Sequence, residues 1–159
     1  MIDKVANMSL EELMSTEIYS ASKRPEKLSE TPAAAYVLSS EDITRSGATN
    51  IPEALRLVPG VQVARTNSST WAITIRGFNR QFSNKLLVLI DGRSVYTPLF
   101  SGVFWDVQDY PLEDIDRIEV IRGPGGTLWG ANAVNGVINI ITKEARKTQG
   151  NYASLAAGN

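Results

Sequence analysis

The hydrophobic residues of the chain fall into short runs that predict strands. The segments 61–65 and 73–76 alternate apolar and polar residues, as half-buried strands do. The run 86–90 is continuously apolar, so a strand covered on both faces is expected there. Further strands are predicted at 33–38, 117–121 and 137–142.

Short helices are predicted between these strands from their capping residues. Ser39 or Ser40 begins a helix that Gly47 ends. Asn50 begins a second helix, which stops before Pro59. Single helical turns are expected at 9–14 and 112–115. Strands that interleave with short helices predict an α+β fold, in which a small mixed β-sheet has short helices packed on it.

The composition is that of one globular domain: 159 residues, 43% of them hydrophobic and 21% charged. The net charge of −1 argues against a nucleic-acid partner, because such proteins usually carry a basic excess. Cys and His are absent, which excludes disulfides, Cys/His zinc sites and catalytic triads with an imidazole base. Only carboxylates, Lys, Tyr or backbone amides are then left for catalysis. Taking the whole sequence together, we expect no catalytic residue, no cofactor and no metal.

Neither a membrane helix nor a secretion signal is predicted. The longest aliphatic run, 86–90, is far shorter than the roughly 20 residues that a membrane-spanning helix needs. The first residues lack the apolar segment of a signal peptide. The chain as given is therefore expected to be soluble.

The densest glycine cluster lies at 122–130 and invites comparison with phosphate-binding loops. It contains no Lys for a P-loop, and Leu128 stands where a dinucleotide motif needs its third Gly. We interpret the glycines as a requirement of backbone geometry, namely positive φ angles and close approach to neighbouring structure.

Four acidic residues stand close together along the chain. They are Glu113, Asp114, Asp116 and Glu119. Such a group can serve acid–base or metal chemistry. Their spacing follows a helix start and then the outward face of a strand, so a solvated face is the favoured interpretation. An enzyme that uses these carboxylates is the weaker one, because no nucleophile–base pair is evident.

Two features predict a recognition surface. The dipeptide Arg-Gly follows a predicted strand twice, at Arg76 and Arg122, and the guanidinium fork suits pairing with the carboxylates of a partner. The predicted loops 65–71, 78–84 and 96–105 carry aromatic residues. Aromatic side chains in loops indicate either local packing or recognition of a partner.

Several segments, taken in order, match one family. They are 32–43 (PAAAYVLSSEDI), 51–61 (IPEALRLVPGV), 75–78 (IRGF), 87–92 (LVLIDG), 117–124 (RIEVIRGP) and 129–143 (WGANAVNGVINIITK). This ordered set strongly resembles the plug domain of TonB-dependent outer-membrane receptors. The resemblance covers about residues 17–143, and no single motif carries it alone.

The resemblance implies a non-enzymatic gate that fills the lumen of a barrel of about 22 strands. The full protein would lie in the outer membrane, with its N-terminus in the periplasm. Residues 1–16 would be an N-terminal extension, 17–31 a TonB-box-like segment with its linker, and 32–144 the plug domain. Residues 145–159 would begin the first strand of the protein's own C-terminal barrel, within a longer exported precursor.

The resemblance also implies roles for individual residues. Glu17, Ile18, Tyr19, Ser20 and Ala21 stand where the family carries its TonB box, an extended peptide that adds a strand to the periplasmic domain of TonB. The loop residues expected to contact an extracellular ligand are Arg65, Trp71, Arg80, Phe82, Tyr96, Phe100 and Trp105. Arg76 and Arg122 resemble the arginines that meet carboxylates on the barrel wall.

We call the predicted loops 65–71, 78–84 and 96–105 the apical loops. By this resemblance, ligand binding at the apical loops shifts the plug's conformations and exposes the TonB box, and pulling by TonB then opens the lumen. The expected ligand is a ferric siderophore, with haem, cobalamin and other bulky ligands as alternatives. A stand-alone periplasmic protein-interaction module is the alternative from a different class. Self-association is a risk for an isolated plug, because surface meant for burial would be exposed.

Overall fold

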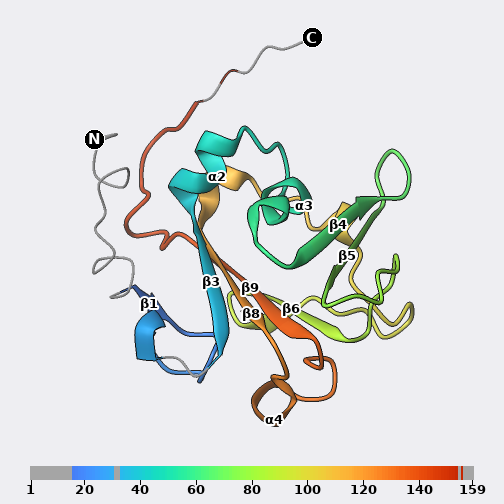
Figure 1. The fold of residues 1–159 in the computed structure, drawn as a ribbon. Helices are drawn as coiled ribbons and strands as arrows, with labels where there is room; N and C mark the ends of the chain where they lie inside the picture. Colours follow the sequence, from blue (N-terminus) through green and yellow to red (C-terminus); the bar gives the residue numbers. More distant parts are fainter. Residues whose placement is uncertain (1–15, 31–32, 154, 156–159) are drawn as a thin grey trace.

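The computed structural model describes residues 16–30, 33–153 and 155. A central β-sheet runs through the molecule, with short helices and a small second sheet against one face (Figure 1). The helical turn predicted at 9–14 lies outside the described residues.

The central sheet has five strands in the order β3-β8-β9-β6-β7. They are β3 (Ala34–Ser39), β8 (Ile115–Arg122), β9 (Gly136–Thr142), β6 (Leu86–Ile90) and β7 (Arg93–Ser94). β6 and β9 are parallel, and the other neighbouring pairs are antiparallel. The sheet is therefore mixed, and the predicted α+β class is confirmed.

The helix caps form as the sequence predicts. The Ser39 hydroxyl accepts the backbone N–H of Asp42 at the start of α2 (Ser40–Ser46), and the Asp42 carboxylate accepts the N–H of Ser39. Gly47 ends this helix in the left-handed conformation. Asn50 caps the short α3 (Ile51–Ala54), which continues as the 3₁₀ turn η2 (Leu55–Leu57). Another 3₁₀ turn, η4 (Leu112–Asp114), occupies the helical turn predicted there.

A second sheet consists of β4 (Val61–Arg65) and β5 (Trp71–Ile75), paired antiparallel. The prediction of a half-buried strand is wrong for β5, because all five of its residues are buried. Ile73 and Ile75 enter the main core, while Thr74 on the opposite side is also buried. The Thr74 hydroxyl donates to the Gly77 carbonyl at 2.7 Å, which satisfies its polar atom away from water.

Two hydrophobic clusters cover the two faces of the central sheet. Alternate residues of β6 divide between them: Leu86, Val88 and Ile90 join the larger cluster, while Leu87 and Leu89 join the smaller one. The strand expected to be covered on both faces is therefore confirmed. α3 and β5 contribute to the larger cluster, and the N-terminal segment contributes Ile18 to the smaller one.

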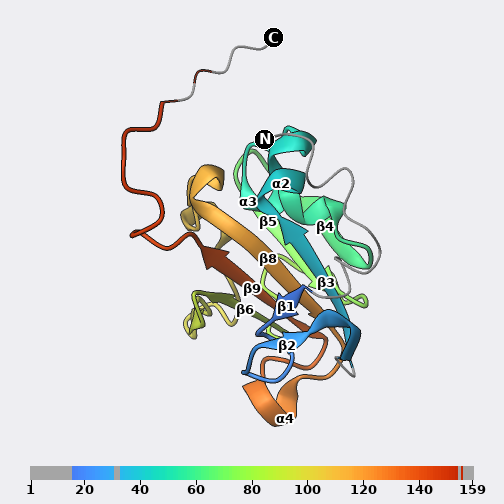
Figure 2. The ribbon, with the colours of Figure 1, turned by 90° about the vertical axis from the view of Figure 1, so that its left-hand side faces the viewer.

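The N-terminal segment forms a small hairpin rather than a strand followed by a linker. β1 (Glu17–Ile18) pairs antiparallel with β2 (Glu26–Lys27), and the 3₁₀ turn η1 (Leu28–Glu30) follows. Part of the linker expected within 17–31 is therefore structured, because Glu26 and Lys27 pair with β1. The hairpin lies near α4 (Gly126–Trp129), as Figure 2 shows.

The end of the described chain carries no regular secondary structure over residues 145–153 or at 155. The start of a further strand within 145–159 stays a prediction. None of the described helices is both long and apolar enough to cross a membrane.

Candidate functional site

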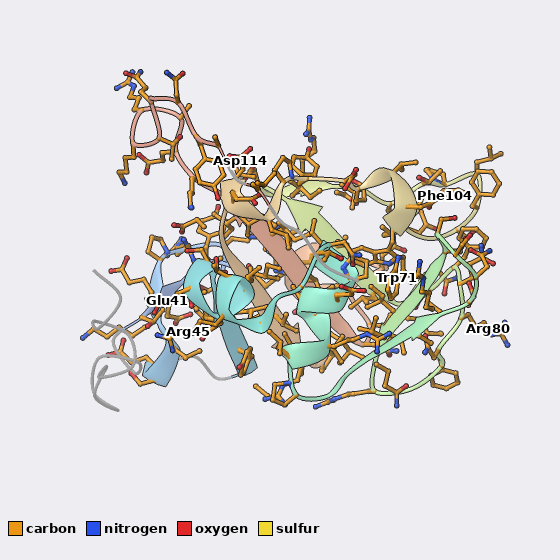
Figure 3. All side chains as sticks on the ribbon, turned by 90° about the horizontal axis from the view of Figure 1, so that it is seen from above. Glu41, Arg45, Trp71, Arg80, Phe104 and Asp114 are labelled. Atoms are coloured by element: carbon orange, nitrogen blue, oxygen red, sulfur yellow. The ribbon has the colours of Figure 1, made fainter. Side chains whose placement is uncertain are left out.

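The aromatic loops gather at one end of the molecule. In the view of Figure 3, Arg80 and Phe104 lie at the end away from Glu41 and Arg45. The rings of Phe82, Phe100 and Phe104 form a mutual cluster, with centroids 4.6 to 5.7 Å apart. Phe104 was missing from the predicted ligand set, although it lies in the aromatic run 96–105 that predicted the loop's role.

Close backbone contact locks two of these loops together. A Cβ placed on Gly102 would lie 2.8 Å from the Cα of Phe82, so only glycine fits between the loops without a shift. The N–H of Thr97 donates to the Gly102 carbonyl at 2.8 Å, and this hydrogen bond closes the turn from Thr97 to Gly102 within the second loop. The Phe82, Phe100 and Phe104 cluster is therefore held by main-chain geometry as well as by ring contacts.

Two of the predicted ligand residues lie in the core. Trp71 is 7% exposed and Trp105 is 6% exposed, and both belong to the larger hydrophobic cluster. The prediction that these indoles face a ligand therefore needs correction: they support the loops from within. Trp71 lies beneath two guanidinium groups, those of Arg56 at 5.7 Å and Arg65 at 5.3 Å from its ring centroid.

The other predicted ligand residues stay nearer the surface. Arg80 is exposed, and Tyr96 and Phe82 are half-buried. Phe100 remains 45% exposed in spite of its ring contacts. Arg65 is directed back to its own loop, where it donates to the carbonyls of Asn67 and Ser68. Their contact with a ligand stays a prediction.

Arg76 and Arg122 come together although 46 residues separate them. Arg76 Nη2 lies 3.5 Å from the carbonyl oxygen of Arg122, and Arg122 Nη1 donates to the Pro59 carbonyl at 3.1 Å. Both side chains line one hollow with Gly60 and Gln62. Among the described residues neither guanidinium forms an ion pair, and Arg122 Nε is buried without a hydrogen-bond partner.

The glycine cluster serves backbone geometry, as predicted. Gly123 has a φ of 145°, which disfavours any side chain. The following α4 is a single turn, and the N–H of Trp129 donates to the carbonyl of Gly125 at 2.8 Å. The segment returns the chain from β8 to its neighbour β9.

The interpretation of the acidic group as a solvated face is wrong for one member. Glu113, Asp114 and Asp116 are exposed, but Glu119 is 0% exposed. Its face of β8 is covered by the N-terminal segment, which lies 99 residues away in the sequence. Within the described ranges, no group of three or more acidic side chains is placed to bind a metal ion.

The carboxylate of Glu119 is the acceptor of a dense hydrogen-bond cluster. Its Oε2 accepts the N–H of Tyr19 at 3.0 Å, the N–H of Ser20 at 2.8 Å and the Ser20 hydroxyl at 2.6 Å. Its Oε1 accepts Arg117 Nε at 2.9 Å, which compensates the buried charge. The indole Nε1 of Trp129 donates to the Ser20 carbonyl at 2.8 Å. We call these five residues the Glu119 cluster.

The TonB-box-like residues are therefore folded against the central sheet. Ile18 and Ser20 are buried, Ala21 is half-buried, and Glu17 and Tyr19 are exposed. The extended conformation ends at Ile18, and residues 20–23 form a turn in which the N–H of Lys23 donates to the Tyr19 carbonyl at 3.0 Å. The expectation of an extended peptide through Ala21 is wrong for this conformation, because two successive N–H groups converge on one carboxylate oxygen.

Comparison with known proteins finds relatives over most of the chain. The Vitamin B12 transporter BtuB of Vibrio vulnificus is 34% identical over 145 residues, 90% of this chain and 23% of the transporter. An iron-regulated outer membrane virulence protein of Vibrio cholerae is 39% identical over 142 residues, 86% of this chain and 21% of that protein. The chain thus spans less than a quarter of the length of these two relatives.

A solved structure and a family model agree with these relatives. The ferric yersiniabactin uptake receptor FyuA of Yersinia pestis superposes with a TM-score of 0.60 at 26% identity, covering 80% of this chain and 19% of the receptor. The model of the TonB-dependent receptor plug domain matches residues 27–137. These relatives are a transporter, an outer membrane protein and an uptake receptor, and the chain is accordingly located at the outer membrane. The chain belongs to the family of TonB-dependent receptor plug domains.

Proposed function

We propose that this chain is the gate of an outer-membrane receptor for a bulky, scarce ligand, opened by TonB. Its exterior would be seated inside the barrel of the same protein. The observation that carries the proposal is the pairing of Arg76 and Arg122. Both side chains line one hollow of the surface, and the described residues supply no carboxylate to either guanidinium.

Arg76 and Arg122 require an acidic partner outside the described residues to compensate their charges. No carboxylate of the described residues compensates either guanidinium, and the Nε of Arg122 is buried without a hydrogen-bond partner. Acidic side chains on a surrounding wall would compensate both charges and fix the plug's orientation through forked hydrogen bonds. This requirement favours a seated plug over a stand-alone module.

The seating is tested by replacing Arg76 and Arg122 with Gln in the full-length protein. Loss of both guanidinium groups would remove their proposed bonds to the barrel wall and loosen the plug, so the channel should conduct ions in planar bilayers at a lower urea concentration than the parent. Arg93→Gln is the matched control, because Arg93 is an exposed residue of the edge strand β7. If the double variant and the control open at the same urea concentration, the seating role is refuted.

The ligand would meet the apical loops through Arg80, Tyr96 and the exposed parts of Phe82 and Phe100. A cationic guanidinium beside aromatic rings suits an anionic ligand with flat apolar parts. A ferric siderophore is the class we propose, supported by the iron-regulated relative and by the ferric yersiniabactin receptor. Cobalamin is the second candidate, supported by the likeness to the B12 transporter.

The choice of ligand is tested by calorimetric titration of the complete receptor in detergent with a panel of ferric siderophores and with cobalamin. A siderophore that binds at micromolar concentration or tighter, while cobalamin does not bind, supports the proposal. Cobalamin binding alone would assign the chain to the second candidate. Binding of neither class, by a folded receptor, would overturn the uptake role assigned to these loops.

The N-terminal residues Glu17, Ile18, Tyr19, Ser20 and Ala21 would bind TonB by strand addition once they are free. Deletion of residues 16–22 from the full-length receptor should abolish uptake of the ligand and leave its binding unchanged, because the N-terminal hairpin lies at the end of the molecule away from Arg80 and Phe104 (Figures 1 and 3). Persistent uptake by the deletion variant would refute the assignment of the TonB-binding segment.

A further inference from the structure

We infer that the Glu119 cluster is an autoinhibitory contact: Glu119 and Trp129 keep residues 19 and 20 out of the strand conformation that a partner strand requires. The inference rests on the proposed TonB-binding role of this segment and names the residues that regulate it. It follows from the hydrogen bonds of two successive residues, which differ from those of any β-strand.

The backbone geometry at Tyr19 and Ser20 is incompatible with strand addition. In a β-strand, the N–H groups of neighbouring residues point to opposite edges, and each edge pairs with a different strand. Here the N–H groups of Tyr19 and Ser20 donate to the same oxygen, Glu119 Oε2. A partner strand can pair with these residues only after at least one of the two bonds breaks and the backbone straightens.

The carbonyl side of the segment is occupied as well. Trp129 Nε1 donates to the Ser20 carbonyl, and the Lys23 ammonium lies 4.5 Å above the centre of the Trp129 ring. The Tyr19 carbonyl accepts the N–H of Lys23 within the turn. The backbone groups of Tyr19 and Ser20 that a partner would use are thus all engaged inside this chain.

The cluster is placed where a change in the plug would open it. Glu119 lies in β8, opposite Val37 of β3 and Asn139 of β9, so its position is fixed by the central sheet. Trp129 lies instead in the short α4, on the glycine-rich connection that begins after Arg122. A displacement of this connection relative to the sheet would move one part of the contact away from the other.

The contact is weakened selectively by two conservative variants of the full-length protein. Glu119→Gln places an NH₂ group where one carboxylate oxygen now accepts, so either the N–H groups of Tyr19 and Ser20 or Arg117 lose their acceptor. Trp129→Phe keeps an aromatic ring under Lys23 and removes the donor to Ser20 together with one ring of the indole. Glu113→Gln is the matched control, because it makes the same charge change at an exposed position of η4.

The first measurement is hydrogen–deuterium exchange of the Tyr19 and Ser20 amides in the protein without TonB. Loss of a hydrogen bond to a charged acceptor should speed this exchange on the order of tenfold in Glu119→Gln. Exchange at Tyr19 should also rise in Trp129→Phe, and the control should match the parent. If the amides stay as protected as in the parent in both variants, the autoinhibitory contact is refuted.

The second measurement is the affinity of the purified periplasmic domain of TonB for the same proteins. If the cluster competes with strand addition, its loss raises the fraction of competent molecules, and Glu119→Gln should tighten binding on the order of tenfold. If amide exchange is faster but none of the proteins binds TonB, the hydrogen-bond contact is supported and the proposed TonB-binding role is refuted. Faster exchange with unchanged, measurable TonB affinity would show that the contact does not inhibit.

Discussion

The substitution Gly136→Ala tests how tightly the central sheet is built at its most crowded glycine. Gly136 begins β9, between Leu86 of β6 and Arg122 of β8. A Cβ at this position would lie 2.4 Å from the carbonyl oxygen of Ile121 and 2.9 Å from Cδ1 of Ile75. A glycine inside a strand often marks such an approach of another backbone, and the added methyl has nowhere to go.

The expected cost follows from which atoms have to move. The Ile75 side chain could adjust, but the Ile121 carbonyl belongs to the backbone of β8, which pairs on both sides. Relief of the contact needs a shift of about 1 Å in a ladder of hydrogen bonds. The energetic cost of such a shift lies at the upper end of overpacking penalties. We therefore expect the free energy of unfolding to fall by about 3 kcal/mol.

The assay is urea unfolding of the 159-residue chain followed by fluorescence of its three Trp residues. With a slope of about 2 kcal/mol per molar urea, the midpoint should fall by roughly 1.5 M in Gly136→Ala. Gly126→Ala is the control, since a Cβ there meets nothing within 4 Å, and its midpoint should stay equal or rise slightly. A midpoint for Gly136→Ala within about 0.3 M urea of the parent's midpoint would contradict the packing described for β9.

Three further predictions concern the core, a helix cap and the apical loops. Ile138→Ala should lower the free energy of unfolding by about 3 kcal/mol, because Ile138 is buried at the centre of β9, and a loss below about 1 kcal/mol would contradict this burial. Ser39→Ala removes the cap of α2 and should cost about 1 kcal/mol in the same assay, whereas no loss would show that Asp42 suffices. Gly102→Ala forces apart the backbones at Gly102 and Phe82 and should weaken calorimetric ligand binding by the complete receptor several-fold; unchanged affinity would exclude this loop pair from recognition.

Local signals predicted the elements that depend on neighbouring residues. The cap at Ser39, the stop at Gly47 and the apolar run of β6 each require only contacts within a few residues, so they could be predicted without the tertiary structure. The ordered set of family segments extended this prediction to the mixed sheet as a whole. The presence of a small mixed sheet was thus predicted from the sequence, whereas the order of its strands was not.

Errors arose where residues distant in sequence determine the environment. Glu119 alternates with apolar residues of β8 as an outward-facing residue does, but residues 18–20 cover that face. Thr74 has the same pattern in β5 and is equally buried. The two indoles Trp71 and Trp105 follow or adjoin loops in the sequence and yet pack into the core. Alternation shows that a strand has two different faces, and only the tertiary fold decides whether the polar one meets water.

The energetics of the N-terminal hairpin explain why its attachment can be reversible. A hairpin of two-residue strands is not stable alone, so it depends on burial of Ile18 and on the Glu119 cluster. Burial of Ile18 contributes about 1.5–3 kcal/mol, and three hydrogen bonds to a carboxylate contribute about 1.5–3 kcal/mol each. Ordering the six residues 19–24 costs about 1–2 kcal/mol per residue, which is of the same size. The favourable and unfavourable contributions therefore nearly cancel, and the hydrogen bonds to Glu119 are the largest favourable part. A segment held with so small a balance detaches when the Glu119 carboxylate loses its donors, and this is the reversibility that the proposed autoinhibitory contact requires.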